Sequence, residues 1–307
     1  MISVVKVELG NFEMLKWVLA TVLVCATSGA RAADYADLPV LRGSLREQTS
    51  TGRNWDGWYA GGQFGYSAGN LDFSHASQSL TDFMLRNSVL QVPVQSWALL
   101  EAKDATSLGF GGFVGRNWQW EDAVIGIELN YTNLRGLRSS SGSTMTRSIL
   151  NPAGETAPSG HDYRYDTTLT GATTGQIKDL MTVRAKGGWD AGAFMPYIFG
   201  GLALGRVQIS RSATLDVTKH DLYTVTAGGV TFPMDVSTPG NATPTPSSKT
   251  EGGADAIAAG YTVGLGTEML VAGNLFLRAE WEYVQLMKIH DVAFSVNTAR
   301  AGIGYRF

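Results

Sequence analysis

The sequence predicts an all-β protein, an eight-stranded antiparallel transmembrane β-barrel with long extracellular loops. Three observations support this prediction. Charged residues make up 17% of the 307 residues, below the roughly 25% of an average soluble chain. No run of about 18 apolar residues occurs, which argues against a transmembrane helix. Apolar and polar residues instead alternate in segments that recur to the C-terminus, as on strands with one face in lipid.

The N-terminal residues predict a cleaved signal peptide. Lys16 supplies a positive charge, residues 17–27 are apolar, and Ala30-Arg31-Ala32 fits a cleavage site. We therefore expect a signal peptide at 1–32, with Met14 as an alternative start, and a periplasmic tail at 33–54. The apolar stretch is short for a membrane anchor, and Val24 disfavours lipid attachment at Cys25.

The barrel is predicted at 55–307, with strands at 57–69, 107–119, 123–133, 180–189, 196–207, 259–269, 275–285 and 293–307. Successive side chains of a strand point to opposite faces. On the first strand, Trp58, Phe64 and Tyr66 therefore share a predicted lipid face. Gln63 and Ser67 share the lumen face.

The second and third strands repeat this alternation. Leu108 and Phe110 point outward on the second strand, and Asn117 points inward. On the third, Ile127 is assigned to lipid and Glu128 to the lumen. Arg116 interrupts the outer set near a strand end, where a long side chain can reach the interface.

The fourth strand places Val183 outside and Arg184 inside. The fifth is ambiguous, because Tyr197, Ile198 and Phe199 are all apolar. We favour the solution in which its outward residues are Ile198, Leu202 and Leu204.

The last three strands alternate clearly. In the sixth, Val263 faces lipid and Glu268 faces the lumen. In the seventh, Trp281 faces lipid between two inward glutamates, Glu280 and Glu282. The eighth assigns Arg300 to the lumen.

The connections alternate between short and long. Short turns follow strands two, four and six and are predicted to face the periplasm, as in bacterial barrels. Long loops are expected at 70–106, 134–179 and 208–258, and the fourth loop is brief. Alternation continues at 163–169 and 207–217, which indicates hairpins that project above the membrane. A ten-stranded barrel is the alternative.

The inward positions carry charges of both signs, and Arg306 of the last strand is among them. We name the following residues the lumen network: Glu128, Arg184, Lys186, Glu268, Arg278, Glu280, Glu282 and Arg300. An eight-stranded barrel is narrow and its interior is nearly filled by side chains. Charges there must pair, because an unpaired buried ion is very costly. A structural salt-bridge network is the favoured interpretation. A gated ion path is the alternative, and a catalytic carboxylate pair is a distant third.

Several segments carry a family resemblance: Trp58–Gly62, Gly200–Ala203, Thr262–Gly266, Gly304–Phe307 and, in the tail, Asp37–Ser44. Together they resemble the small porin-like surface-antigen barrels of alphaproteobacteria, which are related to the OmpA-like transmembrane domain. The resemblance implies eight strands and insertion by the outer-membrane assembly machinery. That machinery recognises a final strand like this one, so Ile303, Tyr305 and Phe307 form the expected assembly signal.

Other site types find little support. A net charge of −3 argues against nucleic acid as a partner. The single cysteine lies in the predicted leader and the four histidines are scattered, so we expect no metal site and no cofactor. His290 and Asp291 are adjacent, but a solvated turn explains them better than catalysis. Trp97 could stack on a sugar, although local packing is favoured.

The favoured function is a non-enzymatic structural and surface-exposed role in the cell outer membrane. A narrow porin-like channel for small solutes is the alternative, and a lipid- or peptide-cleaving enzyme is a distant third. The expected partners are outer-membrane lipids, lipopolysaccharide and the assembly machinery. The sequence does not identify a surface ligand.

Overall fold

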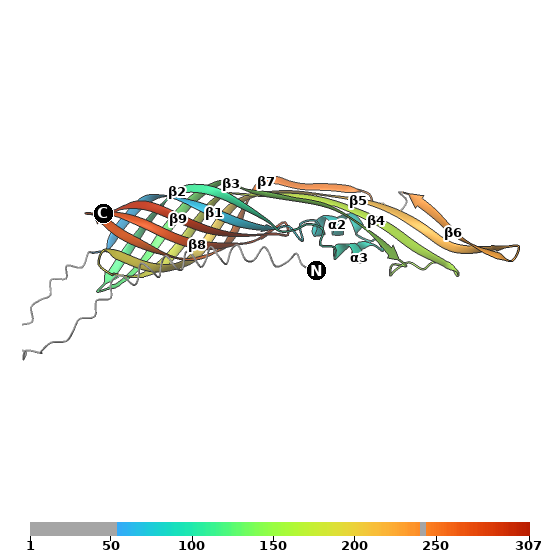
Figure 1. Ribbon diagram of the computed structural model, residues 1–307, viewed down its shortest axis with the longest axis horizontal. Helices are drawn as coiled ribbons and strands as arrows, with labels where there is room; N and C mark the ends of the chain where they lie inside the picture. Colours follow the sequence, from blue (N-terminus) through green and yellow to red (C-terminus); the bar gives the residue numbers. More distant parts are fainter. Residues whose placement is uncertain (1–53, 240–243) are drawn as a thin grey trace, which may run out of the picture. The chain divides into compact units, whose positions relative to one another are not determined.

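The computed structural model describes residues 54–239 and 244–307, except the side chains of Arg135 and Pro239. Its elements are β1 (Gly57–Asp72), α2 (Gln78–Leu85), α3 (Gln91–Gln95), β2 (Lys103–Trp120), β3 (Ala123–Leu150), β4 (His161–Trp189), β5 (Phe194–Ala227), β6 (Val230–Pro239), β7 (Ser248–Ala272), β8 (Leu275–Ile289) and β9 (Val292–Arg306). Adjacent strands pair antiparallel in the order β4-β3-β2-β1-β9-β8-β7-β5 (Figure 1). Pairing of β4 with β5 closes a ring of eight strands.

The predicted strands are confirmed in number and position. Each lies within a strand of the ring, apart from Phe307, which follows the last residue of β9. A further strand, β6, pairs with the distal part of β5 outside the ring, so the ten-stranded alternative is wrong. No helix in the described part of the chain has the length and apolar character needed to span a bilayer.

The lipid and lumen faces follow the predicted alternation. Trp58 is 53% exposed, whereas the next residue, Tyr59, is 1% exposed. The ambiguity in β5 is resolved as expected, since Ile198 and Leu202 lie on the outer face and Tyr197 lies inside. Apolar side chains therefore face outward around a closed ring, as a barrel in lipid requires.

Two belts of exposed aromatic residues border the apolar band. We call one end of the barrel the turn end, because the short turns β2–β3, β4–β5 and β7–β8 lie there, and the other the hairpin end. Trp58, Trp120 and Trp189 belong to the turn-end belt, and Tyr66 and Tyr131 to the hairpin-end belt. From Trp58 to Tyr66 is about 26 Å of strand. A tilt of about 40° reduces this height to about 20 Å, compatible with a thin outer membrane.

Aromatic rings inside the turn end lie against glycines of the neighbouring strands. Tyr59 is paired with Gly115, Phe113 with Gly61, Phe276 with Gly304, Phe199 with Gly264, and Tyr197 with Gly266. A Cβ atom built at Gly304 would meet the ring of Phe276. Glycine at these inward positions leaves the space that the rings fill, so aromatic and glycine residues form complementary pairs.

Replacement of Gly304 with valine should overpack this interior. We expect the free energy of unfolding to fall by about 1–3 kcal/mol, because the buried Phe276 ring must move. Urea unfolding of the protein in lipid vesicles measures the loss. Gly200 lies on the outer face, and a Cβ atom built there would have its nearest neighbour, the backbone oxygen of Thr262, at 3.6 Å. Gly200→Val is therefore the matched control. Equal losses in the two variants would contradict the pairing.

A second hydrophobic core lies at the hairpin end. It joins inward residues of the strands, such as Leu137, Ile177 and Phe294, with residues of the segment between β1 and β2. That segment was predicted as a loop, but it forms α2 and α3, which bury Leu80 and Val94 in this core. The helices lie beside the extended parts of β4 and β5 (Figure 1). We call this assembly the hairpin-end core.

Candidate functional site

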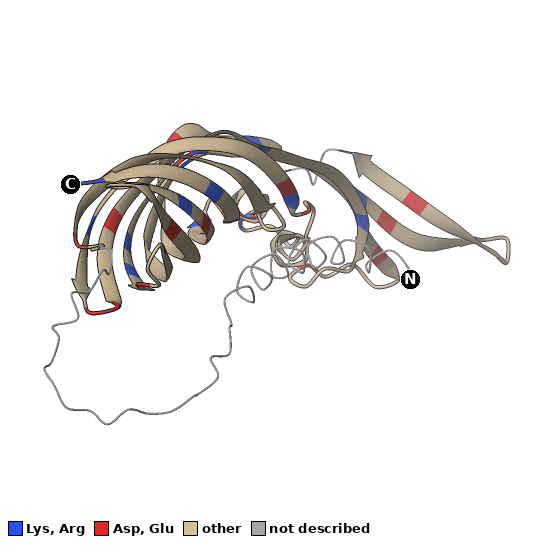
Figure 2. Ribbon diagram, turned by 60° about the vertical axis from the view of Figure 1, so that its left-hand side comes forward, with Lys and Arg blue, Asp and Glu red and all other residues tan. Residues whose placement is uncertain are grey.

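The eight residues of the lumen network come together in the middle of the barrel. They project inward from five strands, with Glu128 on β3, Arg184 and Lys186 on β4, Glu268 on β7, and the others on β8 and β9. Bands of opposite charge lie on neighbouring strands in Figure 2. The cross-strand partners include Glu128 with Arg184, Glu268 with Arg278, and Glu280 with Arg300.

Arg278 connects opposite walls of the barrel. Its two terminal nitrogens donate to Glu128 at 3.0 and 2.7 Å, and Nη2 also donates to Glu268 at 2.6 Å. Both partners and Arg278 itself have side chains no more than 1% exposed. β3 and β8 lie across the ring from each other, so this two-pronged contact spans the lumen.

The other cations are held in the same way. Arg184 donates to Glu128 at 2.5 Å and to Glu280 at 2.8 Å. Lys186 donates to Glu268 at 2.8 Å. Arg300 forms an ion pair with Glu282 and donates to the side-chain oxygen of Asn130 at 3.0 Å. Every charged member of the network therefore contacts at least one opposite charge.

The network is electrically neutral and extends to hydroxyl groups. Four carboxylates meet four cations, so the eight residues of the network carry no surplus charge. Tyr59 donates to Glu128 at 2.8 Å, Tyr197 to Glu280 at 2.5 Å, and Thr262 to Glu282 at 2.8 Å. The sequence interpretation did not include these three residues among the site residues, although inward alternation on their strands could have indicated them.

Hydrophobic groups close both ends of this charged layer. On the turn side lies a core that includes Trp55, Phe113 and Phe276, and on the other side lies the hairpin-end core. The arrangement fills the lumen with paired charges between two apolar layers. Its chemical consequence is an interior in which every charge of the network is compensated by a neighbour of opposite sign.

The residues of the predicted assembly signal share the lipid face near the turn end. Ile303, Tyr305 and Phe307 are exposed, and the rings of Tyr305 and Phe307 meet edge to face at 5.5 Å. The Phe307 amide donates to the carbonyl oxygen of Trp58 at 2.8 Å. The geometry presents a continuous apolar stripe on the final strand.

Beyond the barrel, β3, β4 and β5 continue as one sheet, which β6 extends. The part of β4 from His161 to Asp179 corresponds to about 60 Å of strand. The sheet ends in what we call the distal ribbon, residues 223–236. Five of its apolar side chains are 40–55% exposed: Val225, Val230, Phe232, Met234 and Val236.

An ion pair fixes the loop between β3 and β4 to this sheet. Lys219 donates to Glu155 at 2.5 Å, and its ammonium group lies 3.7 Å from the centre of the Tyr163 ring. Burial tends to raise the pKa of Glu155, but hydrogen bonds from Lys219 and Tyr165 outweigh it and leave that pKa below its usual value. Glu155 is therefore held as a carboxylate at neutral pH.

The histidine and tryptophan candidates have structural partners. His290 and Asp291 form the turn between β8 and β9, both with positive φ. Arg211 donates to the His290 carbonyl oxygen and to the Asp291 carboxylate, each at 3.1 Å. Trp97 is buried in the hairpin-end core. Within the described residues, no cluster of three or more His, Cys, Asp or Glu could hold a metal ion.

The predicted signal peptide and the predicted tail up to residue 53 lie outside the described residues. A family model described as an outer membrane protein beta-barrel domain matches residues 20–307. A comparison with curated proteins finds no match.

Among solved structures, the chain is similar to the attachment invasion locus protein Ail of Yersinia pestis, with 10% identity and a TM-score of 0.29, over 81% of this chain and 99% of Ail. It is similar to Neisserial surface protein A, with 13% identity and a TM-score of 0.28, over 81% and 97% of the two chains. The N-terminal barrel domain of Pseudomonas aeruginosa OprF gives 11% identity and a TM-score of 0.28, over 82% and 98%.

Proposed function

Because this chain belongs to the outer membrane protein beta-barrel domain family, we propose that it is a non-enzymatic surface protein whose sealed barrel anchors a protruding sheet for contact outside the cell. The barrel itself is an outer-membrane structure. The proposal concerns its role there, its orientation and its partners.

The filled lumen is the observation that carries the proposal. Its ion pairs are buried and neutral, and hydrophobic cores lie on both sides of them. A diffusion channel needs a connected aqueous path, and paired charges in a narrow barrel offer none without breaking costly contacts. This favours the structural role over the porin-like alternative.

The size of the hairpin end supports a surface role. Long loops belong to the extracellular side of bacterial barrels, so we place the hairpin end outside the cell. There the hairpin-end core supports a sheet whose distal ribbon exposes a row of apolar side chains. Exposed apolar patches commonly mark interaction sites, and a protein on another surface is the partner that this ribbon suits.

The aromatic belts and the final strand support the proposed contacts with lipids, lipopolysaccharide and the assembly machinery. The aromatic belts suit contact with lipids at the two interfaces, and with lipopolysaccharide on the outer side. The stripe formed by Ile303, Tyr305 and Phe307 suits recognition by the outer-membrane assembly machinery.

Single-channel recording in planar bilayers tests the sealed lumen. We expect no steady conductance from the purified, folded protein. A gel-mobility shift between unheated and boiled samples shows that the sample is folded. Steady ohmic channels from such a sample would overturn the structural role in favour of the porin-like alternative.

Cysteine labelling of intact cells tests the orientation. The only cysteine of the sequence, Cys25, lies in the predicted leader, so single cysteines can be placed without background. Thr231 in the distal ribbon and Ala272, the last residue of β7 before the short β7–β8 turn, are both exposed. A membrane-impermeant maleimide should label Thr231→Cys on intact cells, and Ala272→Cys only after permeabilisation. The reverse pattern would refute the proposed orientation.

A further inference from the structure

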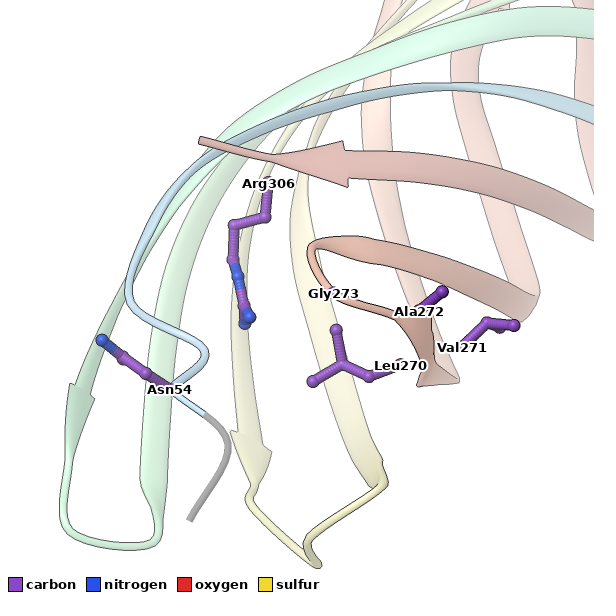
Figure 3. Close-up of a pocket in the computed structure, with 6 residues that line it drawn as sticks. All are labelled: Asn54, Leu270, Val271, Ala272, Gly273 and Arg306. Carbon is purple, nitrogen blue, oxygen red and sulfur yellow. The ribbon is translucent and has the colours of Figure 1, made fainter. Parts of the chain in front are cut away.

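A polar pocket opens at the turn end, separate from the lumen network. Its volume is about 310 Å³, and its lining residues are Asn54, Leu270, Val271, Ala272, Gly273 and Arg306 (Figure 3). Four of these residues belong to the β7–β8 turn region, and Arg306 ends β9. The pocket thus combines a turn backbone with one cationic side chain.

Arg306 extends into this pocket from the end of β9 (Figure 3). The residue is 9% exposed, and its Nη1 atom is buried with no hydrogen-bond partner. The guanidinium carbon lies 5.4 Å from the centre of the Trp55 ring, which covers one side. No ion pair of Arg306 with a described carboxylate is found within 4.0 Å, unlike the four cations of the lumen network.

The nearby acids are engaged elsewhere. Glu268 accepts from Lys186 and Arg278. Asp190 accepts from the Trp55 indole at 3.2 Å and from Gln119 at 3.0 Å. A buried cation without a counter-charge is costly, and a guanidinium offers parallel donors that match a carboxylate or a phosphate.

We propose that this pocket is a binding site for a small oxyanion, a carboxylate or phosphate group, that enters from the aqueous side of the turn end. Arg306 provides the charge and the paired donors, and Trp55 shields one face of the guanidinium. Arg306 points to the lumen, whereas Tyr305 and Phe307 point to lipid. The predicted assembly signal therefore does not account for the arginine.

Fluorescence and thermal stability of the protein in uncharged detergent micelles test the site. Phosphate and succinate are titrated separately at constant ionic strength, with chloride as the reference anion. We expect a saturable change in tryptophan fluorescence that requires Trp55, and a higher midpoint of the heat-induced gel-mobility shift. The dissociation constant should rise at least about tenfold in Arg306→Gln, the loss of about 1.4 kcal/mol or more of binding free energy. Arg306→Lys should give a smaller increase.

Arg138 supplies the matched control, because it is an exposed arginine on β3. Arg138→Gln should leave both responses unchanged, and Trp55→Phe should lose the fluorescence response but keep the thermal one. Mixed micelles with phosphatidylglycerol distinguish the source, since a lipid headgroup that occupies the pocket would compete with phosphate. Wild-type protein that shows no saturable response to either anion would refute the site. A response of Arg306→Gln equal to that of wild type would do the same.

Discussion

Replacement of Arg278 with methionine is expected to destabilise the barrel by about 3–5 kcal/mol. The change removes the guanidinium that donates to both Glu128 and Glu268, and leaves buried carboxylates with fewer counter-charges. Removing one partner of a buried ion pair typically costs about 3–5 kcal/mol, because the other charge remains uncompensated in a medium of low dielectric constant. Urea unfolding in lipid vesicles gives the free energy directly.

The double variant Glu128→Met/Arg278→Met separates charge imbalance from loss of contacts. It removes one charge of each sign and leaves three cations facing three carboxylates. We expect it to be more stable than Arg278→Met alone, because apolar replacement of a whole buried pair is often close to neutral. The surface variant Arg138→Met should change stability by less than about 0.5 kcal/mol. A loss below about 1 kcal/mol for Arg278→Met would contradict a tightly coupled network.

The barrel could be predicted from the sequence because each strand carries its own two-residue alternation of apolar and polar side chains. Each strand has lipid on one face, so every second residue is apolar, and this pattern survives without any knowledge of partners. The lumen network could be predicted for the same reason, since inward positions such as Glu128 and Arg184 carried charge. Which charge meets which across the lumen depends on the ring closure, as in the contact of Arg278 with Glu128.

The helices α2 and α3 could not be predicted in the same way. α2 has eight residues and no side-chain cap at Ser77, so little in the segment favours a helix locally. Its stability derives from burial of Leu80, Met84 and Leu85 against strands distant in sequence. Tertiary packing of this kind leaves no periodic signal in a short segment.

The Ser- and Thr-rich part of β3 shows why the strand ends were also underestimated. Residues 139–143 are small and polar, which is typical of loops, yet they pair with β4. Further along, Thr144 and Thr170 form a hydroxyl contact at 3.0 Å, and Thr146 and Thr168 form one at 2.9 Å. Cross-strand threonine pairs stabilise a sheet, but both members must be known before the pairing can be inferred.

Replacement of Phe307 with serine should prevent most of the protein from reaching the outer membrane while the purified chain still refolds in detergent. Phe307 is 73% exposed on the lipid face, so its loss removes part of an apolar contact. The free energy of unfolding should fall by less than about 1.5 kcal/mol, the lower value for a fully buried side chain of this size. The larger effect is expected in cells, where the resemblance implies recognition of the final strand.

Phe64 provides the matched control for this prediction. It is 67% exposed on the lipid face of β1, so Phe64→Ser removes a similar apolar contact without altering the final strand. Quantification of folded protein in outer-membrane fractions, alongside refolding yields in detergent, separates recognition from stability. A specific signal at the C-terminus requires that Phe307→Ser lowers membrane assembly far more than Phe64→Ser, while the two variants refold equally well in vitro. If both variants assemble equally in cells, the exposed ring of Phe307 acts only as a lipid contact, and the final strand carries no special information for assembly at this position.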